Sequence, residues 1–410
     1  MKEERKMIKD SPSNISREKN ILFLSNGYGE DAIATSIVEN LLKKNPFLKI
    51  KAFPLVGEGK SYSSFPVEVF SSHIKLPSEG FIRNRPLYLL KDIKAGLFKK
   101  ILTYTFNLYK EAKRGRLTVV VGDTFLLFLA GLSVRSPIVF LSTSKSNYKR
   151  GHLAIERCLM KKFCQLVLAR DKLTAESLKK VGIKAMYMGN IMMDCLKITG
   201  EDFGLSPKDK VVGILPGSRR EAYTNIKVIL QSIEIINKKS PLPVKYLLAI
   251  SPSLNITNLG EAIVSQGWKI TDSSDKDKKR GIIAYLSHFN NLKIPVISGK
   301  FGDVLNKSQV IIGLSGTGNE QAAGMGKPVV AFPGKGPQIT KRFLELQSKM
   351  LGGAVIVKPK DPFQIAEELI DLLNNPLRRE KIGKIGKNRM GPPGGSEKVA
   401  SFLIEEFNLY

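Results

Sequence analysis

Cysteine and histidine are scarce in this chain of 410 residues, and each shortage excludes a class of architecture. The three cysteines, Cys158, Cys164 and Cys195, are odd in number and lack the spacing of metal ligands. This argues against a disulfide or zinc framework and indicates a reducing compartment. The three histidines are scattered, and we expect His73 and His152 to be surface or capping residues and His288 to be structural.

Long apolar runs are also missing. The best candidate for a membrane span, residues 124–134, is far shorter than the roughly 20 residues that a spanning helix needs. The first 20 residues are polar and charged, without the apolar core of a signal peptide. We therefore expect a cytoplasmic protein whose contact with a membrane, if it makes one, is peripheral.

Acidic residues are few beside basic ones, since 37 Asp and Glu face 65 Lys and Arg, for a net charge of +28. A generally basic surface explains part of this charge. The functional alternative is attraction to an anionic partner: a membrane surface, nucleic acid or a phosphorylated substrate. No Walker A motif occurs, so an ATPase is unsupported.

Apolar strand-like runs alternate with helical patterns in both halves of the chain, which predicts parallel sheets with helices on both faces. The fold class is therefore α/β, with two Rossmann-like doubly wound domains facing a cleft. We expect a sequence of four parts: a disordered tail (1–19), an N-terminal domain (20–198), a C-terminal domain (205–392) and a C-terminal helix packing back on the N-terminal domain (393–410).

Two glycine-bearing turns in the second half are the strongest functional signal. Residues 213–221 read GILPGSRRE and residues 313–321 read GLSGTGNEQ; each follows an apolar run and opens a helical pattern. A turn between a strand and a helix binds anions, because free backbone N–H groups and the helix dipole point to one spot. Arg219 matches phosphate in two-point geometry, and the Glu320 carboxylate can accept from two hydroxyls. Together they indicate a site for a diphosphate attached to a ribose.

A third turn, residues 27–32, lies after the first predicted strand and formally matches a dinucleotide fingerprint. No acidic residue ends the next strand to hold a ribose. The turn is therefore either a dinucleotide site, a purely structural turn or a site for the reacting end of a substrate. Glu30 and Asp31 favour the last reading, since carboxylates are stabilised at a helix start.

Two further features carry alternatives. Asp123 ends a predicted buried strand, and is either a helix cap or a base that faces the substrate. Residues 81–116 hold ten Lys and Arg against two acidic residues, with apolar residues at helical spacing. This stretch is either an ordinary helix with a solvated basic face or an interfacial element that touches anionic lipid.

The motifs resemble those of the lipid-A-disaccharide synthase family, and of the lipid-A-disaccharide synthase-related proteins in particular. The resemblance covers roughly residues 20–400 and is most specific in the second half. It is carried by the following segments: Gly213–Arg219 with Glu221, Ser315–Glu320, Gly189-Asn-x-x-Met193-Asp194, the Gly334–Gln338 loop and the acidic glycine turn at 27–31.

The resemblance implies a GT-B glycosyltransferase whose C-terminal domain holds a UDP-sugar. Arg219 would hold the diphosphate, Ser315, Gly316 and Thr317 would donate to phosphate, and Glu320 would hold the ribose. The implied nucleotide-sugar site is completed by Gly217, Ser218, Asn319 and Gln338. Asp123, Glu30 and Asp31 would face the acceptor, and one of them would be the base.

The implied reaction is an inverting transfer of an N-acetylglucosamine-type sugar from a UDP donor to a lipid-linked acceptor at the membrane. No cofactor is expected, and the absence of an Asp-x-Asp pair at a strand end predicts no metal. Two departures from the family pattern, Gly29-Glu30-Asp31 and Phe140–Lys145, lie on the acceptor side. The alternatives are a UDP-N-acetylglucosamine 2-epimerase and a non-catalytic basic protein binding anionic lipid or nucleic acid, although we expect no nucleic acid partner.

Overall fold

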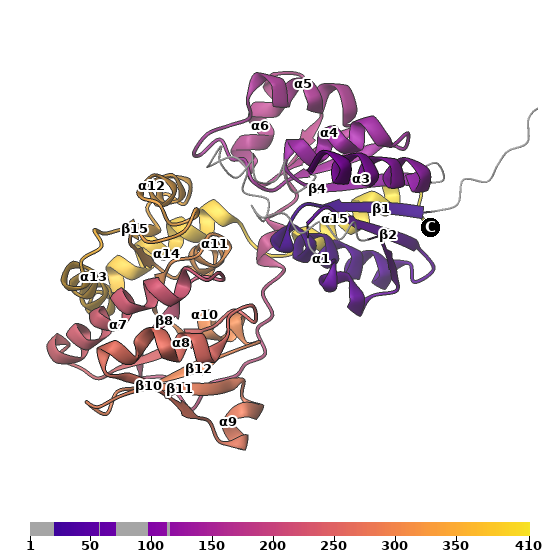
Figure 1. Ribbon diagram of the computed structural model, residues 1–410. Helices are drawn as coiled ribbons and strands as arrows, with labels where there is room; N and C mark the ends of the chain where they lie inside the picture. Colours follow the sequence, from indigo (N-terminus) through magenta and orange to yellow (C-terminus); the bar gives the residue numbers. More distant parts are fainter. Residues whose placement is uncertain (1–19, 57, 71–96, 113–114) are drawn as a thin grey trace, which may run out of the picture.

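The computed structural model describes residues 20–56, 58–70, 97–112 and 115–410, which form two α/β domains (Figure 1). The predicted tail, residues 1–19, and the first part of the basic stretch, residues 81–96, lie outside the described residues, as does His73. The predicted α/β fold with two doubly wound domains is confirmed.

The N-terminal domain is built on a seven-stranded sheet in which every pair of neighbouring strands is parallel. Its strand order, β3-β2-β1-β4-β5-β6-β7, reverses direction between β1 and β4. Such a reversal opens a crevice at the carboxyl ends of the two strands, where ligands bind in folds of this kind. The strands are β1 (Asn20–Ser25), β2 (Lys49–Pro54), β3 (Val67–Val69), β4 (Gly115–Gly122), β5 (Ile138–Ser142), β6 (Leu166–Ala169) and β7 (Ala185–Met186).

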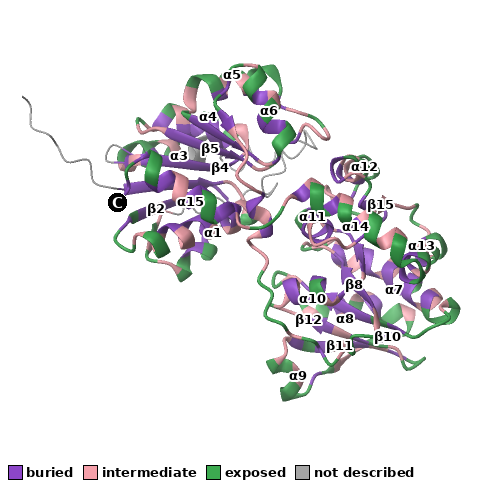
Figure 2. Cartoon of the chain, turned by 180° about the vertical axis from the view of Figure 1, so that it is seen from behind, coloured by how far each residue is buried: buried purple, intermediate pink, exposed green. Residues whose placement is uncertain are grey.

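Helices cover both faces of this sheet, which explains why its central strands are apolar throughout rather than alternating. Ile21 and Phe23 of β1 pack on one face, whereas Leu22 and Leu24 pack on the other, as the two-residue period of a strand requires. Figure 2 shows the strands buried between helices whose outer sides are exposed. The helices are α1 (Tyr28–Lys44), α3 (Leu97–Ala112), α4 (Thr124–Ser133), α5 (Ala154–Phe163) and α6 (Lys172–Lys180), with 3-10 turns η1 (Lys60–Ser64) and η3 (Ile191–Met193).

The C-terminal domain repeats this plan with one addition. Its eight-stranded sheet has the order β10-β11-β12-β9-β8-β13-β14-β15, and the direction reverses between β8 and β13. Its strands are β8 (Lys210–Leu215), β9 (Val244–Ala249), β10 (Trp268–Asp272), β11 (Ile282–His288), β12 (Lys293–Ile297), β13 (Val310–Gly313), β14 (Val329–Ala331) and β15 (Val355–Val357).

The sheet is not wholly parallel, which corrects the sequence-based expectation. β11 pairs antiparallel with both β10 and β12. For the β11–β12 pair, the reason is the short link after His288, where the chain turns through Asn291 at φ 60° and the His288 N–H donates to the Leu292 carbonyl. Four residues cannot make the long crossover that parallel strands need, so a hairpin forms.

Helices again lie on both sides of the C-terminal sheet, and the last of them leaves the domain. They are α7 (Ala222–Lys239), α8 (Ile256–Ile263), η4 (Val264–Gln266), α9 (Asp275–Lys279), α10 (Phe301–Lys307), α11 (Thr317–Gly324), α12 (Lys341–Met350), α13 (Pro362–Asn374) and α14 (Pro376–Met390), followed by α15 (Gly395–Glu406).

The C-terminal helix α15 lies beside α1 of the N-terminal domain, where Val399 and Leu403 join the same hydrophobic cluster as Ile37 (Figure 1). Asp194 caps α15, because its carboxylate accepts from the backbone N–H groups of Gly394 and Ser396. The Gly189–Asp194 motif therefore lies where the returning chain meets the N-terminal domain. A Cβ on Gly189, which has φ 112°, would lie 3.0 Å from Gly395 Cα.

Candidate nucleotide-sugar site

A pocket in the C-terminal domain lies at the carboxyl ends of β8 and β13, on the two sides of the reversal in strand order. The space in and in front of it, open solvent at its mouth included, is about 350 Å³. Three loops form its wall: the turn after β8, the turn after β13 and the 335–339 loop. The predicted site residues among its lining are Gly217, Ser218, Arg219, Ser315, Gly316 and Gln338.

The turn after β8 brings Arg219 to this pocket. Gly217 adopts φ 110°, and a Cβ there would lie 3.1 Å from the Leu314 carbonyl, so only glycine fits this close approach. Ser253 Oγ donates to the Ser218 carbonyl at 2.7 Å and fixes the turn from outside. The partly buried Arg219 thereby lines the pocket beside the first turn of α7.

The turn after β13 presents the N-terminus of α11. Ser315 Oγ accepts from the Gly318 N–H at 3.1 Å, and Thr317 is exposed. Asn319, a predicted site residue, is fully buried and does not line the pocket. Its amide donates to the Gly313 carbonyl at 3.1 Å and to Gln347 Oε1 at 3.2 Å, which ties α11 to its strand and to α12.

The 335–339 loop closes the pocket and brings Gln338 against Gly316. A Cβ on Gly316 would lie 2.9 Å from Gln338 Oε1, so the two residues are in direct contact. Lys335, in the same loop, adds a second cation to the lining. Arg219, Lys335 and the two helix N-termini outweigh the one carboxylate of the lining, Glu221, and give this pocket the character of an anion site.

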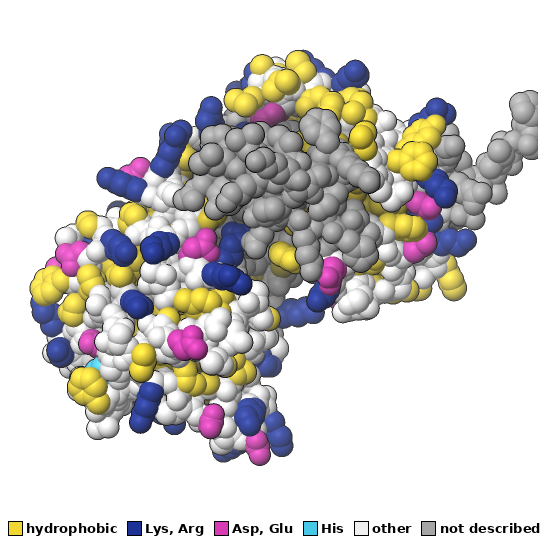
Figure 3. Space-filling model, viewed as in Figure 1, with side chains coloured by type: hydrophobic (Ala, Val, Ile, Leu, Met, Phe, Trp, Pro, Cys, Tyr) yellow, Lys and Arg dark blue, Asp and Glu magenta, His cyan; other side chains and the backbone are white. Residues whose placement is uncertain are grey.

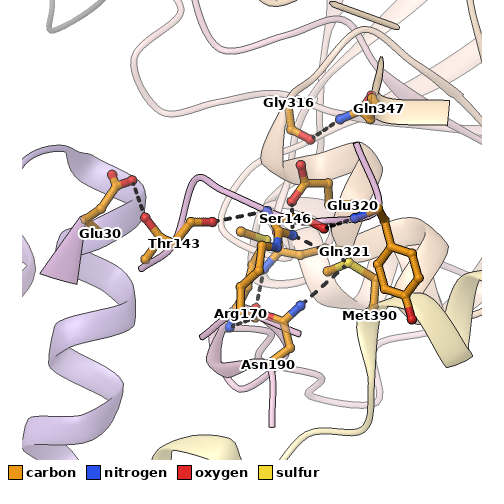
Figure 4. Close-up of polar contacts among 12 residues, drawn as sticks. Glu30, Thr143, Ser146, Arg170, Asn190, Gly316, Glu320, Gln321, Gln347 and Met390 are labelled. Atoms are coloured by element: carbon orange, nitrogen blue, oxygen red, sulfur yellow. Dashed lines mark hydrogen bonds and ion pairs between the residues drawn. The ribbon is translucent and has the colours of Figure 1, made fainter. Parts of the chain in front are cut away.

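Glu320 faces away from this pocket and towards the N-terminal domain. Its Oε2 accepts from the Arg170 guanidinium at 2.8 Å, and both side chains are only 9% exposed (Figure 4). Arg170 follows β6 and is not part of the predicted site. Its position directly after a buried strand is the only sequence signal that could have drawn attention to it.

The N-terminal turn at 27–31 faces the α11 turn across the interface between the domains. A Cβ on Gly29 would lie 3.9 Å from Thr317 Oγ1. Beside it, Glu30 Oε1 accepts from Thr143 Oγ1 at 3.3 Å (Figure 4). Burial raises the pKa of Glu30, and the charge of Asp123 raises it further, while hydrogen bonds from its own backbone N–H and from Thr143 oppose the rise.

Asp31 lies elsewhere than expected, because its side chain points into the N-terminal domain and is 1% exposed. Ser25 Oγ donates to Asp31 Oδ1 at 2.5 Å and lies 2.9 Å from the Tyr62 hydroxyl. Burial raises the pKa of Asp31 to about 7. The Asp31 carboxyl group therefore ties the turn to β1 through Ser25. Of the two acidic residues of the turn, only Glu30 is partly exposed.

Asp123 has the geometry of a helix cap. Its Oδ1 accepts from the backbone N–H groups of Phe125 and Leu126 at 3.1 Å each, at the start of α4. Burial raises its pKa, although these two bonds and one from Asn26 oppose the rise. Asp123 is therefore a helix cap, one of its two predicted roles. It also lies close enough to Glu30 for its charge to raise the pKa of that residue.

Two histidines are buried, and for His152 this differs from the expectation. His152, expected at the surface or as a cap, is 7% exposed, and its Nε2 lies 2.9 Å from Ser142 Oγ. Burial lowers its pKa to about 4, so it is neutral at pH 7. His288 packs between Trp268 and Phe289, with ring centroids 4.8 and 3.9 Å away, in a structural role.

Within the described ranges, no group of three His, Cys, Asp or Glu side chains is arranged to hold a metal ion. None of the helices in those ranges is both long enough and apolar enough to cross a membrane.

Comparison with known proteins places this geometry in a fold class. No family model matches the chain. Among curated proteins, the lipid-A-disaccharide synthase of Geobacter sulfurreducens is 25% identical over 249 residues, which cover 55% of this chain and 58% of that protein. The match thus spans a little more than half the length of that relative.

Among solved structures, the UDP-N-acetylglucosamine 2-epimerase of Neisseria meningitidis bound to UDP-GlcNAc has a TM-score of 0.59 at 19% identity, covering 94% of this chain and 100% of that chain. MurG of Acinetobacter baumannii has a TM-score of 0.55 at 12% identity, covering 94% of this chain and 99% of that chain. The chain therefore has the GT-B fold, which glycosyltransferases and UDP-sugar epimerases share.

Proposed function

We propose that this protein is a glycosyltransferase that moves an N-acetylglucosamine-type sugar from UDP to a lipid-linked acceptor. The observation that carries the proposal is the pocket at the β8 and β13 strand ends, which gathers Arg219, Lys335 and two helix N-termini in one place. The sequence match to lipid-A-disaccharide synthases and the fold of UDP-sugar enzymes support it.

The donor would bind with its diphosphate in this pocket. Arg219 and the backbone of the 315–317 turn would meet the phosphate oxygens, and Gln338, which contacts Gly316, would meet the sugar side. Glu320 lies outside the pocket lining and remains our candidate for the ribose, which would extend from the pocket towards the N-terminal domain, where Arg170 holds Glu320 Oε2. As the glycosidic bond to phosphate breaks, these cations and dipoles would stabilise the negative charge that develops on UDP.

Glu30 is the proposed base, with Asp123 as the alternative beside it. The acceptor hydroxyl would attack the anomeric carbon from the face opposite to UDP, inverting its configuration, and its proton would pass to the Glu30 carboxylate. A raised pKa suits this role, because a stronger base takes the proton more readily at neutral pH. No metal enters this scheme, which relies on Arg219 and the helix N-termini instead.

A lipid surface is the proposed location of the acceptor. Neighbouring helices α3 and α4 expose an apolar face, with Phe106 67% and Phe125 45% exposed, and α5 adds Ile155. Figure 3 shows hydrophobic side chains gathered over this end of the N-terminal domain. α4 begins at its cap Asp123, so this face continues towards Glu30. With a net charge of +28, the protein would dock peripherally on the cytoplasmic, anionic side of a membrane.

A UDP-N-acetylglucosamine 2-epimerase is the second candidate, because the fold of such an epimerase matches nearly the whole chain. It would use the same donor pocket and need no lipid surface. The two functions differ in their products: an epimerase releases N-acetylmannosamine or its UDP derivative from the donor alone.

The experiment that tests the proposal is a calorimetric binding panel of UDP, UDP-GlcNAc and UDP-glucose, followed by mass spectrometry of the products. Incubation with lipid acceptors in anionic vesicles should yield a glycosylated lipid and UDP. Epimerised sugar without acceptor would establish the second candidate, and an absence of UDP binding would overturn both.

A further inference from the structure

Arg170 connects the two domains through three contacts that meet at one guanidinium. Its two terminal nitrogens donate to Glu320 Oε2 at 2.8 Å and to the Thr143 carbonyl at 3.1 Å, and it also touches Met390 Sδ at 3.9 Å (Figure 4). Glu320 and Met390 belong to the C-terminal half of the chain, whereas Thr143 follows β5 of the N-terminal sheet. One side chain thus holds both domains at once.

Each end of this connection leads to a part of the proposed site. Glu320 lies in the first turn of α11, whose N-terminus contributes Ser315 and Gly316 to the donor pocket. On the other side, the hydroxyl of Thr143 donates to the Glu30 carboxylate at 3.3 Å. Glu320, Arg170 and Thr143 therefore connect the helix that borders the donor pocket to the candidate base, although the link through Thr143 is covalent, from its carbonyl to its hydroxyl.

The buried ion pair between Arg170 and Glu320 is better explained by a role in alignment than by a contribution to stability. Removing an arginine and a carboxylate from water costs several kcal/mol per ion, so a buried pair is weak evidence for stability. Its geometry is specific, however, since a planar guanidinium presents its N–H groups in fixed directions. Arg170 uses two of these directions for partners on different domains.

We propose that Arg170 is a positioning residue that fixes Glu30 relative to the donor pocket, so that the acceptor hydroxyl and the anomeric carbon are aligned for transfer. This inference rests on the proposed function. Transfer is sensitive to such alignment, because a misplacement of about 1 Å can reduce the rate by roughly 10²-fold. Arg170 itself need not touch either substrate.

The test compares Arg170→Met and Arg170→Lys with a control, Arg280→Met, which breaks the contacts of Arg280 with Glu201 and Asp202, just before the C-terminal domain and away from the proposed site. Arg170→Met should lower kcat about 10- to 100-fold while the affinity for inorganic pyrophosphate, which would fill only the diphosphate part of the pocket, changes by less than about threefold. Arg170→Lys should recover part of kcat, since an ammonium group keeps the charge and has three N–H donors for partners on both domains, but lacks the fixed directions of a guanidinium. The control should leave kcat unchanged.

A pH profile separates positioning from a merely structural role. The Thr143 hydrogen bond lowers the pKa of Glu30, so loosening Thr143 should move the acidic limb of kcat/KM to higher pH in Arg170→Met. Asp123 also faces Glu30 and is unchanged in every variant. A folded Arg170→Met protein with the parent's kcat and the parent's acidic limb would overturn the inference.

Failure of the proposed function would look different, because the parent protein itself would then bind no UDP or transfer no sugar. The connection can still be tested in that case by NMR titration of ¹³C-labelled carboxylates, with Glu30→Gln identifying the Glu30 signal. A higher Glu30 pKa in Arg170→Met than in the parent supports the link. An unchanged Glu30 pKa rejects it without any reference to turnover.

Discussion

The side chain of Asn225 forms hydrogen bonds with both main-chain polar groups of Lys335. Asn225 Oδ1 accepts from the Lys335 N–H at 3.0 Å, and Asn225 Nδ2 donates to the Lys335 carbonyl at 2.9 Å. Asn225 is buried in α7 and lines the donor pocket, so the helix that borders the pocket also fixes its 335–339 loop. Asn225 could not be predicted as a site residue from the sequence, because an asparagine within a helix carries no distinctive pattern.

Asn225→Ala should therefore weaken UDP binding without removing any proposed ligand contact. Two hydrogen bonds of about 1 kcal/mol each hold the loop, and their loss lets Gln338 and Lys335 move. We expect UDP affinity, measured by calorimetry, to fall about tenfold. Asn40→Ala, which removes a partly buried asparagine from α1, serves as the control and should retain the parent's affinity. Equal affinity in both variants would show that the loop is held by other contacts.

Arg219 and its neighbour Arg220 provide a matched pair for the diphosphate assignment. Arg219 lines the pocket, whereas Arg220 is exposed outside it. Arg219→Ala should reduce UDP binding by on the order of 2–3 kcal/mol, as for a lost charge-assisted contact. Arg220→Ala should change it little. If calorimetry shows the same affinity for the two folded variants, Arg219 does not hold the diphosphate.

Glu30→Gln should abolish most turnover but leave the donor in place. Loss of a general base lowers kcat by roughly 10²–10⁴, and the donor pocket lies in the other domain. In the parent, kcat/KM should fall as the pH drops through the raised pKa of Glu30, since the protonated carboxyl cannot accept a proton; the acidic limb should thus lie above pH 4.5. Asp123→Asn is the comparison. Near-normal turnover of Glu30→Gln together with a severe loss in Asp123→Asn would transfer the role to Asp123.

The domain plan could be predicted from sequence because it depends on local patterns. Apolar strands, helical periods and glycine turns recur within short windows, and they indicated two doubly wound domains. The antiparallel β10–β11–β12 arrangement needed attention to the short link after His288, which leaves no room for a crossover. α14 was missed, since it is strongly basic and its buried residues include Gly383 and Gly386, which carry no apolar signal.

The site was only partly predictable for a different reason. Residues of the glycine turns converge on one pocket because turns after parallel strands share one sheet edge. The partners of Glu320 and Glu30, which are Arg170 and Thr143, lie some 150 and 113 positions away in sequence. No periodicity links residues at such a separation, so only the fold reveals these contacts.

Asp31 provides a prediction about stability rather than turnover. Its pKa rises from an ordinary 3.8 to about 7 on burial, so the folded protein binds the proton more tightly than the unfolded chain. Between those values the folded state carries more protons, and the free energy of unfolding should decrease as the pH rises from 4 to 7. Three pKa units correspond to about 4 kcal/mol.

Asp31→Asn should remove this dependence, because an amide does not titrate. The variant should match the parent in urea unfolding near pH 4 and exceed its stability by a few kcal/mol near pH 8. Asp275→Asn, whose side chain is 95% exposed, should behave as the parent at both values. An Asp31→Asn protein that is less stable than the parent at pH 8 would mean that Asp31 is needed as an ion.

The exposed aromatic residues of α3 and α4 test the membrane contact. Phe106 and Phe125 are 67% and 45% exposed on neighbouring helices, whereas Phe289 is 77% exposed on the C-terminal domain. Burying one such side chain in lipid contributes about 1.5–3 kcal/mol, and each nearby Lys or Arg adds about 1 kcal/mol that salt screens. Phe106→Ser with Phe125→Ser should therefore reduce flotation with anionic vesicles, most clearly at high salt, where only the apolar part remains. UDP affinity should be unchanged, since that pocket lies in the other domain, and Phe289→Ser should float as the parent does. Should the double variant float as well as Phe289→Ser at every salt concentration, the apolar face of α3 and α4 is not the surface that meets the membrane.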